Sequence, residues 1–223
     1  MMNCFRSARQ LCIIQLVWLA FLIPLTAIEA RAAESNGSTV QDPTLRILDR
    51  ASAFFNSGKG DSAMVYYNRA AKLSERQKDT RAKQLEVKAL LGKWSVYFFY
   101  FFDYSKAFEA LAQARLISEQ QAFSTAPVDF REGLLYHALS DQCNDEAAAR
   151  LALNNYQRAF AESGSDTEPQ TLNNMMVNYI LIAHKLGRLS SVRKMWGKYE
   201  KLLGKEKTAN YEFSKLLLEG LTA

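Results

Sequence analysis

Histidine and cysteine, the side chains most often used as metal ligands and nucleophiles, are scarce in this chain of 223 residues. It contains two histidines, His137 and His184, and three cysteines. We find no zinc-ligand spacing around either histidine and predict no metal site. Asp141 and Asp145 lie close to Cys143 in the sequence, and their negative charge disfavours the thiolate that a nucleophilic cysteine needs. These residues therefore indicate neither metal-dependent nor cysteine-dependent chemistry.

Motifs that mark other catalytic sites are also missing from the sequence. We find no glycine-rich phosphate loop, no Gly-x-Ser-x-Gly nucleophile elbow and no paired-carboxylate motif. We therefore predict that the protein is not an enzyme and uses no cofactor. A helical hydrolase or glycan-handling protein stays open as an alternative, because scattered acidic residues can meet in a fold. A carboxylate pair about 5 to 10 Å apart would support that alternative.

The most unusual stretch is an aromatic run from Val96 to Tyr104, with the sequence Val-Tyr-Phe-Phe-Tyr-Phe-Phe-Asp-Tyr. These residue types favour a buried strand locally. A strand there would have no partner, because a chain with only 10 Gly and 4 Pro favours long helices. We therefore predict a helix that is apolar on every side. Such a helix must be buried on at least two faces or expose an aromatic surface.

An internal repeat organises most of the chain. A small or β-branched residue is followed by an aromatic residue or leucine four positions later, and by a further residue seven positions after the first. Offsets of four and seven lie on one helical face, where the small residue lets a neighbouring helix approach closely. The repeat therefore predicts stacked helices. Its four copies are Ala63, Tyr67, Ala70; Ala107, Leu111, Ala114; Ala152, Tyr156, Ala159; and Val192, Trp196, Tyr199.

Three of these segments carry a resemblance to a known family. Residues 58–70 (GKGDSAMVYYNRA) and 103–114 (DYSKAFEALAQA) look like the turn and second helix of a tetratricopeptide repeat, and residues 186–192 (LGRLSSV) are a weaker copy. The resemblance implies an all-α fold, a right-handed α-solenoid of about four helix hairpins plus a C-terminal capping helix. The copies recur every 44, 45 and 40 residues, against a usual period of about 34. HEAT-type helix pairs, which have longer periods, are the structural alternative.

Caps and breakers divide the chain into predicted helices. Asp42 followed by Pro43 is a good helix start, because Pro is preorganised at the first helical position. The last predicted helix has no partner, so its apolar residues Tyr211, Phe213, Leu216, Leu217 and Leu218 should cap the stack or form a docking surface. The predicted helices lie near 43–57, 61–77, 80–102, 104–120, 128–141, 144–163, 168–186, 189–204 and 207–220.

The first 32 residues have the features of a signal peptide. Arg6 and Arg9 precede an apolar run from Leu11 to Ala27, and Ala30 and Ala32 form a small-x-small cleavage pattern. We therefore predict export to the periplasm or the bacterial cell surface. The alternative is an uncleaved membrane anchor, for which the run is marginally long given a hydrocarbon core of about 30 Å. Residues 33–41 are then a disordered linker, and residues 42–223 form the repeat domain.

Cleavage after Ala32 also changes the cysteines and the charge. Cys4 and Cys12 leave with the signal, so Cys143 becomes the only thiol and no intramolecular disulfide is expected. The formal net charge is +5 for the whole chain and +3 without the signal. So small an excess argues against nucleic acid or an anionic membrane surface as the partner.

The tetratricopeptide resemblance also implies a binding site. In that family the first helix of each hairpin lines a concave groove, and an apolar, aromatic groove suits an amphipathic helix or an extended segment. We therefore predict an exported scaffold that binds a protein or peptide partner. The inward positions in this register include Ser52, Phe55, Val96, Phe99, Tyr100 and His184.

A second, looser resemblance gives an alternative function. The segments 61–67 and 97–107 are similar to the extracytoplasmic repeat region of membrane-anchored bacterial transcription regulators. This likeness implies a stand-alone or truncated sensor half of such a regulator, which would bind partners but not regulate transcription by itself.

Overall fold

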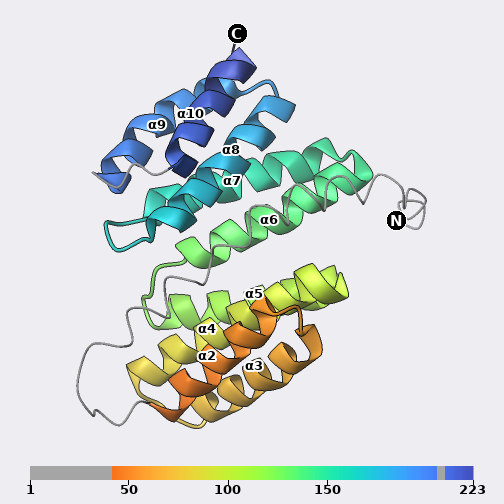
Figure 1. The fold of residues 1–223 in the computed structure, drawn as a ribbon, viewed down its shortest axis with the longest axis vertical. Coiled ribbons are helices and arrows are strands. Elements are labelled where there is room, and N and C mark those ends of the chain that lie inside the picture. Colours follow the sequence, from red (N-terminus) through yellow and green to blue (C-terminus); the bar gives the residue numbers. More distant parts are fainter. Residues whose placement is uncertain (1–41, 205–208, 223) are drawn as a thin grey trace. The chain divides into compact units, whose positions relative to one another are not determined.

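The computed structural model describes residues 42–204 and 209–222, and every regular element in these residues is helical (Figure 1). The chain divides into two compact units, of which the second begins at Ser124. The first contains α2 (Pro43–Asn56), α3 (Gly60–Glu75), α4 (Thr80–Val96), the π-helix η1 (Tyr97–Phe101) and α5 (Tyr104–Gln120). The second contains α6 (Ala126–Cys143), α7 (Glu146–Glu162), α8 (Pro169–Lys185), α9 (Leu189–Leu203) and α10 (Ala209–Thr222). The predicted all-α class is confirmed.

Four helices begin with an aspartate cap, of which Asp42 was predicted from the sequence. The carboxylates of Asp42, Asp79, Asp103 and Asp145 each accept a hydrogen bond from a backbone N–H in the first turn of the following helix, at 2.8 to 3.0 Å. These bonds satisfy amide groups that a helix leaves without an internal partner. The predicted boundaries hold to within a few residues, except that the helix expected over 80–102 is divided between α4 and η1.

The turns inside the helix pairs share one backbone feature. Gly58, Phe102, Asn144 and Gly187 all have positive φ, between 49° and 78°, and they recur at intervals of 44, 42 and 43 residues. A left-handed residue lets the chain leave one helix and start the next in a few residues. Measured from this turn, the residue equivalent to Ala63 in the third pair is Ala149, one helical turn before the predicted Ala152.

The small residues of the repeat are buried where helices approach one another. The predicted alanines are fully buried, as are Leu111, Tyr156, Val192 and Tyr199, whereas Trp196 is half-buried. Tyr67 lies so close to Gly92 in α4 that a Cβ there would be 2.2 Å from its ring. In this contact the tyrosine fills a groove that only glycine leaves open, which fixes the spacing between α3 and α4.

Helix α10 packs against α8 in the second unit, and its apolar residues are only partly covered. Tyr211 is buried and stacks on Tyr199, with ring centroids 5.9 Å apart. Leu217 and Leu218 are half-buried, whereas Phe213 and Leu216 are exposed. The helix therefore covers one side of its unit and keeps an apolar face of its own.

The predicted signal peptide (1–32) and linker (33–41) lie outside the described residues. Among the helices that the structure does describe, none is sufficiently long and apolar to span a bilayer. Cys143 is disulfide-bonded in this structure. The expectation of a lone thiol concerns the chain after removal of residues 1–32 and stays a prediction.

Candidate functional site

The aromatic run forms the turn between α4 and α5 and contains a π-helix. The backbone widens over Tyr97–Phe101, and the carbonyl of Tyr97 accepts from the N–H groups of both Phe102 and Asp103. A π-helical turn accommodates one more residue than an α-helical turn and is found frequently at functional sites. The strand propensity of these residue types is thus overridden, because the segment connects α4 to α5 within one helix pair.

The buried side of the run is a close-packed aromatic base. Phe98 stacks on Trp94 with ring centroids 5.0 Å apart. Its centroid lies 4.7 Å from that of Phe99, in an edge-to-face contact, and 5.6 Å from that of the tilted Tyr104 ring. Phe98 and Trp94 are both buried. Such interlocked rings hold the backbone of the turn in a fixed position.

The other side of the run carries two exposed phenylalanines. Phe101 is 40% exposed and Phe102 is 51% exposed. Phe102 also has φ 52° and ψ 28°, a left-handed conformation that costs a bulky residue roughly 1 to 2 kcal/mol. Glycine holds the equivalent turn position at Gly58 and Gly187. A strained and exposed aromatic residue, at a position where glycine would avoid the strain, indicates a role outside folding.

An ion pair flanks the two phenylalanines. Lys106 Nζ lies 2.9 Å from the carboxylate of Asp103 and 5.8 Å from the centroid of the Tyr97 ring. Hydrogen bonds from the backbone and side chain of Lys106 lower the pKa of Asp103. Together Tyr97, Phe101, Phe102 and Lys106 form a surface that we call the aromatic turn. It combines apolar contact area with one cation that a partner can reach.

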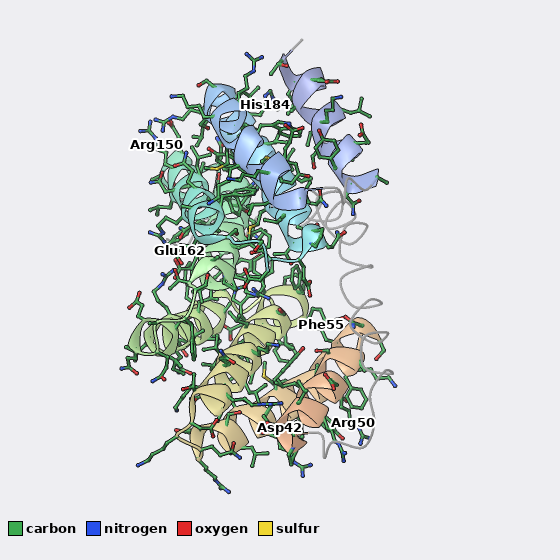
Figure 2. The ribbon with its side chains drawn as sticks, turned by 90° about the vertical axis from the view of Figure 1, so that its left-hand side faces the viewer. Asp42, Arg50, Phe55, Arg150, Glu162 and His184 are labelled. Atoms are coloured by element: carbon green, nitrogen blue, oxygen red, sulfur yellow. The ribbon has the colours of Figure 1, made fainter. Side chains whose placement is uncertain are left out.

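Four of the six predicted groove residues lie together in the first unit, where all four are half-buried. The Tyr100 hydroxyl donates to the Phe55 carbonyl at 2.5 Å, and the two rings meet edge to face with centroids 5.2 Å apart. The ring centroids of Phe99 and Phe55 are 6.2 Å apart. Ser52 Oγ is 3.3 Å from the Tyr67 hydroxyl. Phe55, Phe99 and Tyr100 therefore pack α2 against η1, and Ser52 links α2 to α3 (Figure 2 labels Phe55).

The remaining two groove residues differ from these four. Val96 is fully buried in the core of the first unit, so its side chain does not reach the surface. His184 is exposed on α8 of the second unit (Figure 2). The structure therefore does not gather all six residues on one continuous surface of a single unit.

A polar group in the second unit looks like a catalytic dyad but is closed to substrates. Lys185 Nζ donates to Ser140 Oγ at 2.7 Å, to the Ser140 carbonyl at 3.0 Å and to Asp141 at 2.9 Å. A serine and a lysine at this distance can form a nucleophile and its base. Ser140 is fully buried, however. We interpret the contact as structural, because Lys185 adds a charged donor to the Ser140 carbonyl near the end of α6 and pairs with Asp141.

The same group continues into the core through His137. Asp141, four residues later on α6, places its carboxylate 3.8 Å from His137 Nε2, and Nδ1 lies 3.2 Å from the Tyr156 hydroxyl. His137 and Asp141 are four residues apart and share one helical face, a spacing that is visible in the sequence. Burial lowers the pKa of His137 to about 4, although Asp141 opposes the effect. The ring is therefore neutral at pH 7 and bridges α6 and α7.

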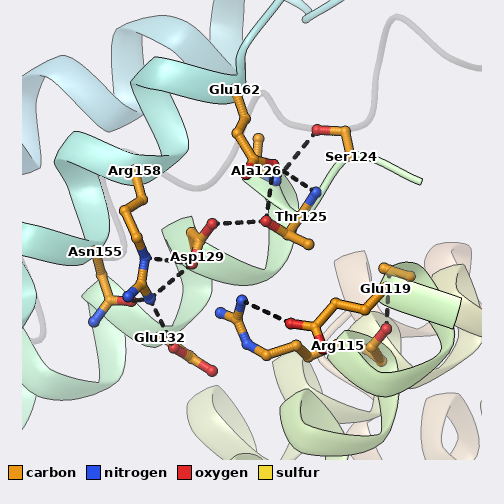
Figure 3. A network of polar contacts seen from close by, with 12 residues as sticks. Arg115, Glu119, Ser124, Thr125, Ala126, Asp129, Glu132, Asn155, Arg158 and Glu162 are labelled. Atoms are coloured by element: carbon orange, nitrogen blue, oxygen red, sulfur yellow. Dashed lines mark hydrogen bonds and ion pairs between the residues drawn. The ribbon is translucent and has the colours of Figure 1, made fainter. Parts of the chain in front are cut away.

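A second polar network joins the start of α6 to α7 (Figure 3). Buried Asp129 accepts from Arg158 Nε at 3.0 Å and from the Thr125 hydroxyl at 2.9 Å. The Thr125 N–H and hydroxyl lie 2.9 and 2.8 Å from Glu162. Asn155 accepts from Arg158 as well. Each of these polar groups has a partner on α6 or α7 or at the start of α6, so we interpret the network as a structural link between the two helices.

Sequence reasoning identified the aromatic run but missed which of its residues face outward. That choice depends on the π-helical turn, for which the sequence gives no periodic signal. Within the described part of the chain, no group of three or more His, Cys, Asp or Glu residues could hold a metal ion. Comparisons with family models, curated proteins and solved structures find no match to this chain.

Proposed function

We propose that this chain is an exported, tetratricopeptide-like scaffold that binds a protein or peptide partner through its aromatic turn. The observation that carries the proposal is the outward placement of Phe101 and Phe102 on a strained backbone. Aromatic side chains on a rigid base supply much contact area with little loss of conformational freedom, which is typical of residues that dominate binding. The stacked rings of Trp94 and Phe98 supply that base.

The finer architecture belongs to the same proposal. We propose a right-handed α-solenoid in which α2–α3, α4–α5, α6–α7 and α8–α9 are the four hairpins and α10 is the terminal helix. Support comes from the left-handed turn residues, which recur every 42 to 44 residues, and from the fully buried alanines five residues after three of the turns. Export rests on the signal-peptide pattern of residues 1–32.

The predicted groove residues take a supporting role in this proposal. Tyr100, Phe99 and Phe55 pack against one another, so truncating them would disturb the fold as well as any binding. Phe101 and Phe102 are exposed and can be changed with less effect on folding. They therefore separate binding from stability better than the groove residues do.

The proposal is tested by partner recovery from the envelope fraction. The variant Phe101→Ser/Phe102→Gly removes the exposed rings and leaves glycine at the left-handed position. The matched control is Leu151→Ser/Leu181→Ser, which removes two exposed apolar side chains from the second unit. We expect wild type and control to retain the same partners and the aromatic-turn variant to lose them. Equal recovery by all three proteins, with equal thermal stability, would remove the aromatic turn as the binding site.

A further inference from the structure

A groove on the outside of the first helix pair forms a surface distinct from the aromatic turn. We infer that the groove between α2 and α3, on the side of α3 away from its buried face, binds an acidic amphipathic helix of another polypeptide. This goes beyond the proposed function, because it assigns a second surface and a partner of stated chemistry. It can fail while the aromatic turn still binds.

The floor of this groove is apolar and open. Pro43 and Ile47 of α2 and Val65 and Leu73 of α3 line a hollow of about 570 Å³. Val65 is 64% exposed, so the described part of the first unit leaves the hollow open. An apolar hollow of this kind on a protein surface commonly receives side chains of a partner.

The rim of the groove is positively charged. Arg69 and Lys72 of α3 and Arg76, the residue that caps its C-terminal end, line it at offsets of three and seven, and no carboxylate lines it. All three are exposed. Residues at these offsets share one helical face, so the three cations form a row beside the apolar floor. A partner with carboxylates in a matching row would complement this charge.

Nearby acidic residues are directed elsewhere. Asp42 forms an ion pair with Arg81, with Nε and Oδ2 3.5 Å apart. Burial raises the pKa of Asp49, and the charge of Lys88 on α4 opposes this only in part. Neither carboxylate lines the groove. The row of cations is therefore not neutralised by these two groups.

Beyond the hollow, α2 and α3 carry an aromatic pair. Phe54 of α2 and Tyr66 of α3 have ring centroids 5.2 Å apart, and the Arg50 guanidinium lies 5.0 Å from the Tyr66 centroid and 5.8 Å from that of Phe54 (Figure 2 labels Arg50). Pro43, Ile47, Arg50 and Phe54 follow one face of α2 at helical spacing. That face is about 17 Å long at 1.5 Å per residue, the length of three helical turns.

A helix is the occupant that fits this surface. Helix α4 packs against both α2 and α3 within the same unit, so the pair already accepts one helix across its two members. An incoming helix would place leucine-sized side chains over Ile47 and Val65 and carboxylates opposite Arg69, Lys72 and Arg76. This is the helix-in-groove mode of recognition, with anchors at offsets of three, four and seven.

The test uses a synthetic 14-residue peptide with leucine on one helical face and glutamate on the others. A second peptide replaces every glutamate by lysine, and a third scrambles the acidic one so that it is no longer amphipathic. Binding to the full chain is followed by fluorescence anisotropy. We expect the acidic amphipathic peptide to bind at least about tenfold more tightly than the other two, as charge pairing and apolar burial together require.

Variants then place the binding in this groove. Arg69→Glu/Lys72→Glu should weaken binding of the acidic peptide about tenfold and strengthen binding of the lysine peptide. Val65→Ser should weaken binding of the acidic peptide and leave binding of the lysine peptide unchanged. The matched control, Lys194→Glu/Lys201→Glu, makes the same charge change at exposed positions on α9 and should leave both affinities unchanged. The aromatic-turn variant should bind the acidic peptide as wild type does.

Several outcomes would overturn the inference. Equal binding of the scrambled acidic peptide would show unspecific attraction, and equal effects of the α3 and α9 variants would place the site elsewhere. Binding to phosphatidylglycerol vesicles without binding to the peptide would make the partner a membrane. A wild-type dimer in sedimentation that Val65→Ser abolishes would make the occupant a second copy of this chain.

Discussion

Acid should destabilise the second unit through His137, whose side chain is buried and neutral. The residue is 4% exposed, and burial lowers the pKa of its ring from 6.5 to about 4. The ammonium of Lys185 acts in the same direction, whereas the carboxylate of Asp141 opposes it. Asp141 is itself paired with Lys185 at 2.9 Å, which weakens its hold on the imidazole. Burial therefore decides the direction of the change.

The sign and size of the effect follow from proton linkage. The unfolded chain takes up this proton near pH 6.5 and the folded chain only near pH 4, so protonation favours unfolding. The loss of free energy of unfolding is absent above pH 6.5 and complete below pH 4. At about 1.4 kcal/mol per pH unit, it comes to about 3 kcal/mol. That is a large part of the free energy of unfolding of a typical domain, which is about 5 to 15 kcal/mol.

The variant His137→Gln isolates this contribution. Glutamine does not titrate, and its amide can still form a hydrogen bond with the Tyr156 hydroxyl, so we expect it to cost about 1 kcal/mol at pH 7. Urea unfolding between pH 7 and pH 4 measures the free energy of unfolding of each protein. The wild type should lose about 3 kcal/mol more than the variant over this range. His184→Gln, which replaces the exposed histidine, is the control and should follow the wild type.

The reasoning about His137 would be refuted by parallel stability curves for wild type and His137→Gln. It would also be refuted by an NMR titration of the His137 ring with a midpoint near 6.5, because burial would then have little effect on its pKa.

Two further predictions test the packing of the helices, both by urea unfolding. Gly92→Ala should cost about 1 to 3 kcal/mol, because its Cβ would lie 2.2 Å from the Tyr67 ring. Gly197→Ala, a matched change with nothing within 4 Å, should instead stabilise α9 by up to about 1 kcal/mol; a similar cost at both sites would contradict the close contact. Tyr100→Phe should cost about 1 kcal/mol by removing the hydroxyl that donates to Phe55, and an unchanged stability would show that this bond contributes nothing.

The parts of the fold that were predictable depend on local rules. Asp42 and Pro43 start α2 where the capping preference puts it, and Gly58 takes the left-handed turn expected of glycine. Ala63 and Ala107 are fully buried, as their spacing indicated. In each case the residue type constrains its own backbone or its nearest neighbour on one helix face, so no knowledge of distant segments is needed.

What could not be predicted depends on contacts between distant segments. Phe102 takes a left-handed conformation that its residue type disfavours, because the aromatic base beneath the turn fixes the backbone. His137 is paired with Tyr156 on the neighbouring helix, a contact that only the packed unit defines.

The proposed binding role of the aromatic turn is tested most directly by site-specific photo-crosslinking in cells. A photoreactive phenylalanine analogue is introduced at position 102, and at Leu151 of the second unit as an exposed apolar control. We predict a discrete cross-linked protein from position 102 that is absent from position 151 and is lost when Phe101→Ser is added. Identical cross-linking patterns at the two positions, or none at either, would contradict binding through this turn.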